Sequence, residues 1–276
     1  MPNSGYAHVL KNRGFACLLV AQALSVFDDN AFRYVLQLLA IDTVATLSGQ
    51  SRLVSYCNAL FVLPYVLFSA YAGQVADRFS KRGVIVSLKL LEVGLMAAAA
   101  LAVYSGSVPL MLAVLFLAGT HSAFLAPAKE GILPQMLPDR DLSRANGLMQ
   151  LTVYTMIIIG PVVAGVLRPS FRSQPWVPVA FLIPIALGSF AVSLGITRLP
   201  AIAPGEKLRL NAIAEFRKNF GEIRSSRDLF LTVLGIAYFW FLGTIYLQNV
   251  LIYGRDLLRL GDRGVTLLNA CVSIGI

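Results

Sequence analysis

Long runs of apolar residues constrain this chain more than any other feature. Seven stretches approach or exceed the roughly 20 residues that a helix needs to cross a ~30 Å hydrocarbon core. They cover residues 14–41, 53–75, 83–105, 108–128, 147–168, 177–197 and 230–253. An eighth begins near residue 264 and continues to Ile276. A transmembrane β-barrel would instead alternate in ~10-residue segments. The pattern therefore predicts an all-α polytopic membrane protein.

Composition supports a membrane protein and excludes several other classes. Of the 276 residues, 57% are hydrophobic and only 13% are charged, about half the charge of an average soluble domain. An ordinary soluble enzyme, a nucleic-acid-binding module and a disordered chain are therefore excluded. The net charge of +9 is typical of basic membrane loops and indicates no nucleic-acid partner. Cys17, Cys57 and Cys271 lie far apart in apolar runs, so we expect neither a disulfide framework nor a metal or cofactor site.

The basic residues predict an orientation. With the N-terminus in the cytoplasm, the interior loops hold fifteen Lys and Arg residues and the exterior loops hold six. The positive-inside rule favours this arrangement. It predicts a multi-pass chain with a cytoplasmic N-terminus.

The longest interior loop divides the chain into three parts. Residues 1–197 form a six-span bundle, 198–229 a cytoplasmic linker, and 230–276 the start of a second bundle. In the linker, Ile213, Phe216, Phe220 and Ile223 recur at helical spacing, which predicts an amphipathic helix on the membrane surface, with a solvated linker helix as the alternative. Six spans, a basic loop and further spans are typical of a two-bundle transporter. Since two six-span bundles need roughly 400 residues, we expect most of the C-terminal bundle to be missing from this chain.

The first apolar stretch carries three charges near its middle, Asp28, Asp29 and Arg33. Each charge at mid-membrane costs roughly 2.5–3.5 kcal/mol, so such residues indicate function more often than chance. Asp29 and Arg33 are spaced for an i,i+4 ion pair, whereas Asp28 points about 100° away and needs another partner. One helical face is predicted to carry Gln22, Ser25, Asp29, Arg33 and Gln37. A structural buried ion pair is the alternative to a cavity-lining role.

Other polar residues interrupt the later stretches. Lys89 and Glu92 form an i,i+3 pair, with Lys89 close enough to the cytoplasmic end to reach water. Ser122 and Lys129 share a face, and His121 reads as a hydrogen-bonded packing residue more readily than as a proton carrier. In the seventh stretch Thr244 and Gln248 share a face, where aromatic packing is as good an explanation as ligand contact.

Two loop and helix motifs resemble those of the major facilitator superfamily. The segment from Gly73 to Arg82, with Asp77 and Arg78, is similar to the signature loop of that family, although Ser80 replaces its second glycine. Gly73 is expected to permit close helix approach, and Asp77 to interact with the exposed N–H groups of the following helix. Gly160-Pro161 with Gly165 resembles the glycine-proline motif of antiporter members and predicts tight crossing.

A narrower resemblance covers most of the chain. Residues 27–33, 127–134, 142–147 and 235–243 resemble segments of bacterial lysophospholipid transporters and of the related membrane domain fused to acyltransferase and acyl-carrier-protein synthetase modules. The second of these has Glu130 where those proteins have an aromatic residue. The resemblance implies alternating-access transport of a lysophosphatidylethanolamine-like lysophospholipid across the bacterial inner membrane, in which the chain is expected to lie. The expected partners are membrane lipid, an acyltransferase or acyl-carrier-protein synthetase, and the C-terminal bundle.

The polar residues fit such a substrate. Arg33 and Lys129 are suited to its phosphate, and Asp28 and Asp29 to its ammonium. The other substrate-binding candidates are Asn30, Glu92 and Gln248.

Two alternatives stay open, a proton-coupled exporter of drugs or other amphiphiles and a non-transporting scaffold for an acyltransferase. We expect no enzymatic activity, because neither His8 nor His121 is followed at the fifth position by the Asp of an acyltransferase pair.

Overall fold

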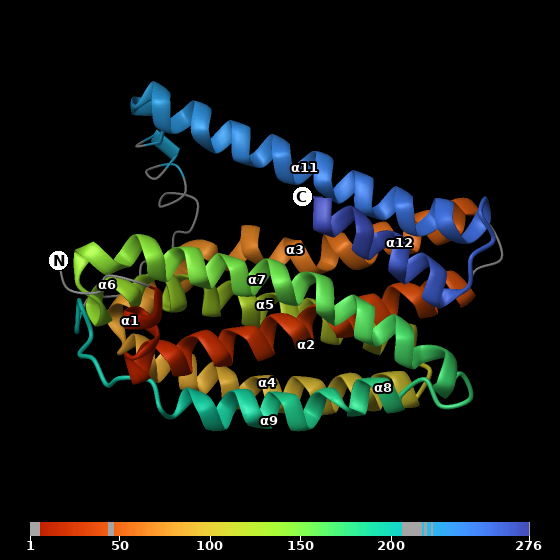
Figure 1. The fold of residues 1–276 in the computed structure, drawn as a ribbon, viewed down its shortest axis with the longest axis horizontal. Helices are drawn as coiled ribbons and strands as arrows, with labels where there is room; N and C mark the ends of the chain where they lie inside the picture. The colour runs from red at the N-terminus through yellow and green to blue at the C-terminus, as the bar shows by residue number, and fades with distance from the viewer. Residues whose placement is uncertain (1–5, 44–46, 206–216, 218–219, 222, 276) are drawn as a thin grey trace.

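The computed structural model describes residues 6–43, 47–205, 217, 220–221 and 223–275. Its described residues form an elongated bundle of roughly parallel and antiparallel helices (Figure 1). The first half of the chain contributes α1 (Tyr6–Leu10), α2 (Arg13–Thr43), α3 (Leu47–Arg78), α4 (Lys81–Tyr104), α5 (Val108–Gly131), α6 (Leu133–Met136) and α7 (Asp139–Leu167). The rest consists of η1 (Arg168–Phe171), α8 (Val177–Ala180), α9 (Leu182–Ser193), α11 (Arg227–Asp256) and α12 (Asp262–Gly275). The predicted all-α class is confirmed.

Six helical segments are long and apolar enough to cross a membrane, and they match six of the seven predicted stretches. The remaining stretch, 177–197, forms two shorter helices, α8 and α9, which meet at Phe181. Pro184 explains this break, because proline has no N–H and its ring clashes with the carbonyl four residues earlier. That carbonyl belongs to Ala180, the last residue of α8. The two helices together make one apolar helical segment, Val177–Ser193, which is shorter than the predicted stretch.

Helix α2 lies inside the first bundle, packed mainly against α7 and α9, while α3 packs on α5 (Figure 1). Two clusters of buried apolar side chains stabilise the two halves of the first bundle. One contains Phe32, Met96 and Leu115, and the other contains Phe15, Ile85 and Leu125. Each cluster draws on α2, α4 and α5, so the stretches between them on these helices form a layer across the bundle.

Helix α11 differs from the helices of the first bundle. None of the residues in its most apolar window is buried, whereas half of those in α2 are. It meets α12 and one end of α3, and diverges from α7 toward its own N-terminus (Figure 1). Its aromatic contact with α7 is the stack of Trp240 on Tyr154, whose ring centroids are 6.1 Å apart.

Two predictions about organisation are not tested. The three-part division at residues 197 and 229 stays a prediction. The linker helix does too, because most of it, including Ile213 and Phe216, lies outside the described residues; Phe220 and Ile223 are described as helical.

Candidate functional site

A polar layer crosses the first bundle between its two apolar clusters. On α2 it contains Gln22 and Ser25, each 3% exposed, Asp28 and the half-buried Asp29. Its partners come from the middle of α4 and α5 and from α9. Because hydrocarbon on either side offers no hydrogen bonds, the groups in this layer depend on one another.

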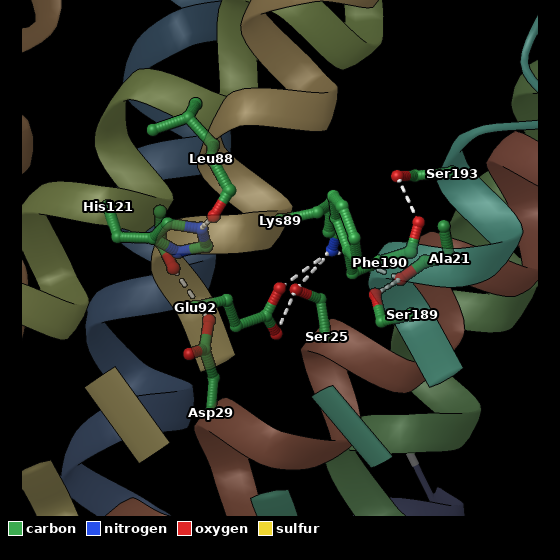
Figure 2. A network of polar contacts seen from close by, with 11 residues as sticks. Ala21, Ser25, Asp29, Leu88, Lys89, Glu92, His121, Ser189, Phe190 and Ser193 are labelled. Atoms are coloured by element: carbon green, nitrogen blue, oxygen red, sulfur yellow. Dashed lines mark hydrogen bonds and ion pairs between the residues drawn. The ribbon is translucent and has the colours of Figure 1, made fainter. Parts of the chain in front are cut away.

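Lys89 and Glu92 of α4 are the residues of this layer whose polar groups have the most hydrogen-bond partners. We call them and their partners the Lys89 cluster (Figure 2). The Lys89 ammonium lies 3.1 Å from Glu92 Oε2, and both side chains are 1% exposed. Lys89 also donates to the Ser25 hydroxyl and, at 3.1 Å, to the Ala21 carbonyl. Ser25 donates to Glu92 Oε1 at 2.5 Å, and Ser189 of α9 donates to the same Ala21 carbonyl at 3.0 Å.

The Lys89 cluster corrects one prediction. Lys89 does not extend to the aqueous end of the membrane, because its ammonium is neutralised and hydrogen-bonded inside the bundle. Both Glu92 oxygens are already bound as well. That Glu92 contacts substrate stays a prediction, and contact would require the cluster to open.

His121 lies at the edge of the same layer (Figure 2). The ring is 3% exposed, and its Nε2 is 3.0 Å from the Leu88 carbonyl. This geometry agrees with the interpretation of His121 as a hydrogen-bonded packing residue.

Arg33 lies one helical turn beyond Asp29 and is the centre of a second group, hereafter the Arg33 cluster. Its guanidinium donates to the Asn30 side-chain oxygen at 2.6 Å and stands 5.0 Å from the centroid of the Phe61 ring of α3. Asp29 instead accepts a hydrogen bond from Ser122 of α5 at 2.6 Å. Among the ion pairs between described residues, none joins Asp29 to Arg33. No direct ion pair forms, because neutral groups from α2, α3 and α5 make the direct contacts of both side chains. Asp29 still stabilises the Arg33 charge through space, as its i,i+4 position predicts.

Asp28 is the exception in this layer. Its side chain is 0% exposed, and neither carboxyl oxygen has a hydrogen-bond partner among the described residues. The partner expected from its position on α2 is therefore not found. A buried carboxyl left without partners is costly unless it takes up a proton or a cationic group.

Lys129 and Gln248 lie apart from these clusters. Lys129 is half-buried and seven residues beyond Ser122 on α5, which is about 10 Å along the helix axis. It lies on the opposite side of Asp29 from Arg33, because α5 runs antiparallel to α2. Gln248 belongs to α11, but its side chain is outside the described residues.

The loop between α3 and α4 is held to the end of α9. Arg82 donates to the carbonyls of Leu194 and Ile196, each at 2.8 Å, and Ser80 donates to that of Leu199 at 2.9 Å. Arg78 stacks on Phe79 with 5.5 Å between its guanidinium carbon and the ring centroid. The loop therefore ties the second and third spans to the segment that leaves the first bundle.

Two details of this loop were predicted wrongly. Asp77 does not cap α4; Ser80 accepts the hydrogen bond from Gly83 N at 3.5 Å, while Asp77 pairs with Lys81 at 3.1 Å. Gly73 does not mark a close approach, since a Cβ there would meet nothing within 4 Å. The residue that replaces the second glycine of the motif is thus the helix cap.

Gly160 and Pro161 behave largely as expected. A Cβ on Gly160 would lie 2.9 Å from the Phe27 carbonyl of α2, and one on Gly165 would collide with Thr266 of α12. These glycines therefore permit close crossing of α7 with both helices. Pro161 removes one hydrogen bond, yet α7 continues through it.

Sequence reasoning missed several participants. Phe61 and Ser189 carry no pattern that distinguishes them from packing residues. Asp42, which binds Arg168 and Arg255, lies just beyond the first predicted stretch. The sequence offered one indication: Asp42 directly follows the first apolar stretch, at the exterior end where the loops that contain Arg168 and Arg255 were also predicted to lie.

Comparisons with known proteins agree with this architecture. Residues 18–276 match the model of the Major Facilitator Superfamily. The chain is 31% identical over 277 residues to the lysophospholipid transporter LplT of Salmonella gallinarum and 31% identical over 275 residues to that of Salmonella newport. Each alignment covers 96% of this chain and 64% of the relative, so the chain spans just under two thirds of their length.

Solved transporters share the fold. A POT family transporter in complex with a thioalcohol-conjugated peptide aligns with a TM-score of 0.55 at 17% identity, covering 89% of this chain and 51% of the other. A second, in complex with 5-aminolevulinic acid, gives a TM-score of 0.54 at 17% identity over the same shares.

Proposed function

The chain belongs to the major facilitator superfamily, and from that premise we propose that it takes part in moving lysophospholipids across a bacterial inner membrane by alternating access. The 31% identical relatives are lysophospholipid transporters, which supports this substrate. The positive-inside bias supports a cytoplasmic N-terminus. Re-acylation by an acyltransferase or acyl-carrier-protein synthetase is the proposed next step, with the scaffold role as its non-transporting alternative.

The observation that carries the proposal is that Arg33 is placed inside the bundle with neutral groups as its direct contacts. Its guanidinium lies inside the first bundle and contacts an amide oxygen and an aromatic ring. Asp29 offsets the burial of this cation only through space, without a direct ion pair. An anion that binds the guanidinium directly therefore recovers more of the free energy lost on removing it from water. A lysophospholipid phosphate is such an anion, and guanidinium matches its oxygens in pairs.

The neighbouring residues fit the rest of the headgroup. Asp29 is half-buried and hydrogen-bonded only through a neutral hydroxyl among its described contacts, so it can receive an ammonium group. Asn30 holds Arg33 in place, and Asp28 is a second acceptor once the helices move. Lys129 is about 16 Å from Arg33 along the bundle axis by helix rise, so we propose that it meets the phosphate at a later stage of transport.

Replacing Arg33 tests the proposal. In spheroplasts that express the full-length protein, Arg33→Gln should lower uptake of radiolabelled lysophosphatidylethanolamine at least about tenfold. A charge-assisted hydrogen bond contributes about 1.5–3 kcal/mol, and 1.4 kcal/mol is tenfold in affinity. Arg52→Gln, at an exposed position of α3, is the matched control. Unchanged uptake by Arg33→Gln at equal protein level would contradict the proposal.

Asp28 favours a second candidate, proton-coupled export of other amphiphiles. A buried carboxyl without hydrogen bonds can take up and release a proton as the helices alternate. In this case Asp28→Asn should abolish pH-driven efflux of a cationic dye. Lysophospholipid uptake with no dye efflux would reject this candidate.

A further inference from the structure

Tyr65 of α3 lies beside the Arg33 cluster, one helical turn from Phe61. Its ring is half-buried, and 6.4 Å separate its centroid from that of the Phe61 ring. Its phenol hydrogen-bonds the side chain of Ser122 on α5. It also lies near enough to Asp29 and Arg33 to interact with the charge of each. Tyr65 therefore connects α3 to the residues proposed to face the headgroup.

Tyr65, Ser122 and Asp29 form a hydrogen-bonded chain with a fixed direction, hereafter the hydroxyl chain. Ser122 donates its hydroxyl proton to Asp29 Oδ2 at 2.6 Å. A serine hydroxyl has one proton to donate and two lone pairs that accept, so in the bond between Tyr65 and Ser122 the phenol is the donor. Each hydrogen bond in such a chain polarises and strengthens the next. Asp29 is therefore held by two residues from neighbouring helices.

The hydroxyl chain holds Asp29 toward α5, although a cation is within reach on α2. Arg33 follows Asp29 by four residues, a spacing at which an acid and a base can pair directly. Its guanidinium has five N–H donors, of which one bonds Asn30 among the contacts of the described residues. Both partners of a direct ion pair are thus present. Asp29 nevertheless accepts from Ser122 and acts on Arg33 only through space.

We propose that Tyr65 and Ser122 are positioning residues that hold Asp29 away from Arg33 and so keep the guanidinium open to a phosphate. The consequence for the substrate rests on the function proposed above. A zwitterionic headgroup carries its phosphate and its ammonium at the two ends of a short carbon spacer. Opposite charges that are kept apart in the protein can bind both groups, whereas a closed Asp29–Arg33 pair would already be neutralised.

Loss of the hydroxyl chain should close that pair. Without the Ser122 hydroxyl, the half-buried Asp29 loses its hydrogen-bond donor, which is costly. Lys89 also acts on Asp29 through space, but its ammonium has three donors and three partners within the Lys89 cluster. Asp29 should therefore turn to Arg33. Tyr65→Phe should act in the same direction but more weakly, because the Ser122 hydroxyl remains.

The first measurement needs no substrate. Thermal unfolding of the full-length protein in detergent micelles compares Asp29→Asn, Arg33→Gln and their double variant, in the native background and with Ser122→Ala. In the Ser122→Ala background the Tm shifts of the two changes should depart further from additivity, by about 2–4 °C, because the residues then form a direct pair. Thr120→Val is the matched control, since this hydroxyl of α5 bonds the Phe116 carbonyl of its own helix.

The second measurement determines the consequence for binding. Isothermal titration calorimetry uses short-chain lysophosphatidylglycerol, which has a phosphate but no ammonium, so Asp29 makes no attractive contact with it. We expect Ser122→Ala to weaken binding about tenfold, Tyr65→Phe to weaken it a few-fold, and Thr120→Val to leave it unchanged. Adding Asp29→Asn to Ser122→Ala removes the competing carboxylate and should restore the affinity. Loss of packing at Ser122 would not be rescued in this way.

Increased coupling of Asp29 with Arg33, together with rescue by Asp29→Asn, supports the inference. The inference is overturned if Ser122→Ala leaves the coupling unchanged, or if the weakened binding persists when Asp29→Asn is added. Tyr65→Phe, which keeps the ring, replaces Ser122→Ala in both measurements if that variant does not fold. Should the coupling rise while no form of the protein binds the lysolipid, the positioning of Asp29 is supported and the proposed substrate is rejected.

Discussion

The Lys89 cluster and the Arg33 cluster lie about two helical turns apart on α2, and they treat buried charge in opposite ways. Lys89 faces Glu92 at 3.1 Å, and Ser25 bridges the two. Arg33 faces an amide oxygen and the Phe61 ring. In the first cluster opposite charges satisfy each other and leave nothing for a ligand. In the second cluster the direct contacts of Arg33 are neutral groups, and Asp29 acts on it only through space. The guanidinium can therefore still bind an anion directly.

The largest expected effect is on the Lys89 cluster. Lys89→Met leaves Glu92 buried without its cation, and breaking such a pair costs about 3–5 kcal/mol in the free energy of unfolding. Unfolding of the purified protein in mixed detergent micelles measures this value. The double variant Lys89→Met/Glu92→Leu removes both charges and should regain most of the loss. Equal stability of the single and double variants would show that the two charges are not coupled.

The next largest effect is expected where α7 packs against the α2 residues that position Arg33. A Cβ on Gly160 would meet the Phe27 carbonyl and Asn30, so Gly160→Ala pushes α7 away from the residue that holds Arg33. Overpacking of this kind costs about 1–3 kcal/mol, and transport should fall with it. Gly147→Ala in the same helix is the matched control.

At Gly147 a new Cβ meets nothing within 4 Å. The change to alanine should therefore stabilise α7, by about 0.5–1 kcal/mol, because alanine is the better helix former. Opposite signs at the two glycines in thermal unfolding would support the α7–α2 crossing. Two stabilising changes would contradict it.

The smallest effect tests the aromatic partner of Arg33. Phe61→Leu keeps an apolar side chain but removes the cation–π contact, which contributes about 0.5–2 kcal/mol. We expect stability to change by about 1 kcal/mol and lysophospholipid uptake to fall a few-fold. Phe79→Leu, at the exposed Arg78 stack, should change neither quantity measurably. If both variants match the unmodified protein, the ring contributes only packing.

Several features could be predicted from sequence because they follow from one-dimensional patterns. Apolar runs located six of the long helices, and a run of small residues located the crossing at Gly160. His121 was interpreted correctly because a lone histidine on an apolar helix has few partners other than a carbonyl. The break at Phe181 was missed, although Pro184 was visible, since proline does not always end a membrane helix.

Pairing was the least predictable property. Helical spacing places Arg33 within reach of Asp29, but spacing within one helix says nothing of the competing groups that other helices bring. Ser122 and Phe61 come from α5 and α3, and they replace the expected ion pair. The same holds for Asp42, whose partners are 126 and 213 residues away in the chain.

The sequence by itself determined that this chain is an α-helical membrane protein of the major facilitator superfamily, because hydrocarbon requires long apolar helices and the motifs are local. Only the tertiary structure decided which buried charges are neutralised and which are left for a ligand. That outcome depends on distances of a few ångströms between side chains of different helices. Lys89 and Arg33 are both cations within apolar stretches, and only their neighbours in space distinguish a structural residue from a candidate binding residue.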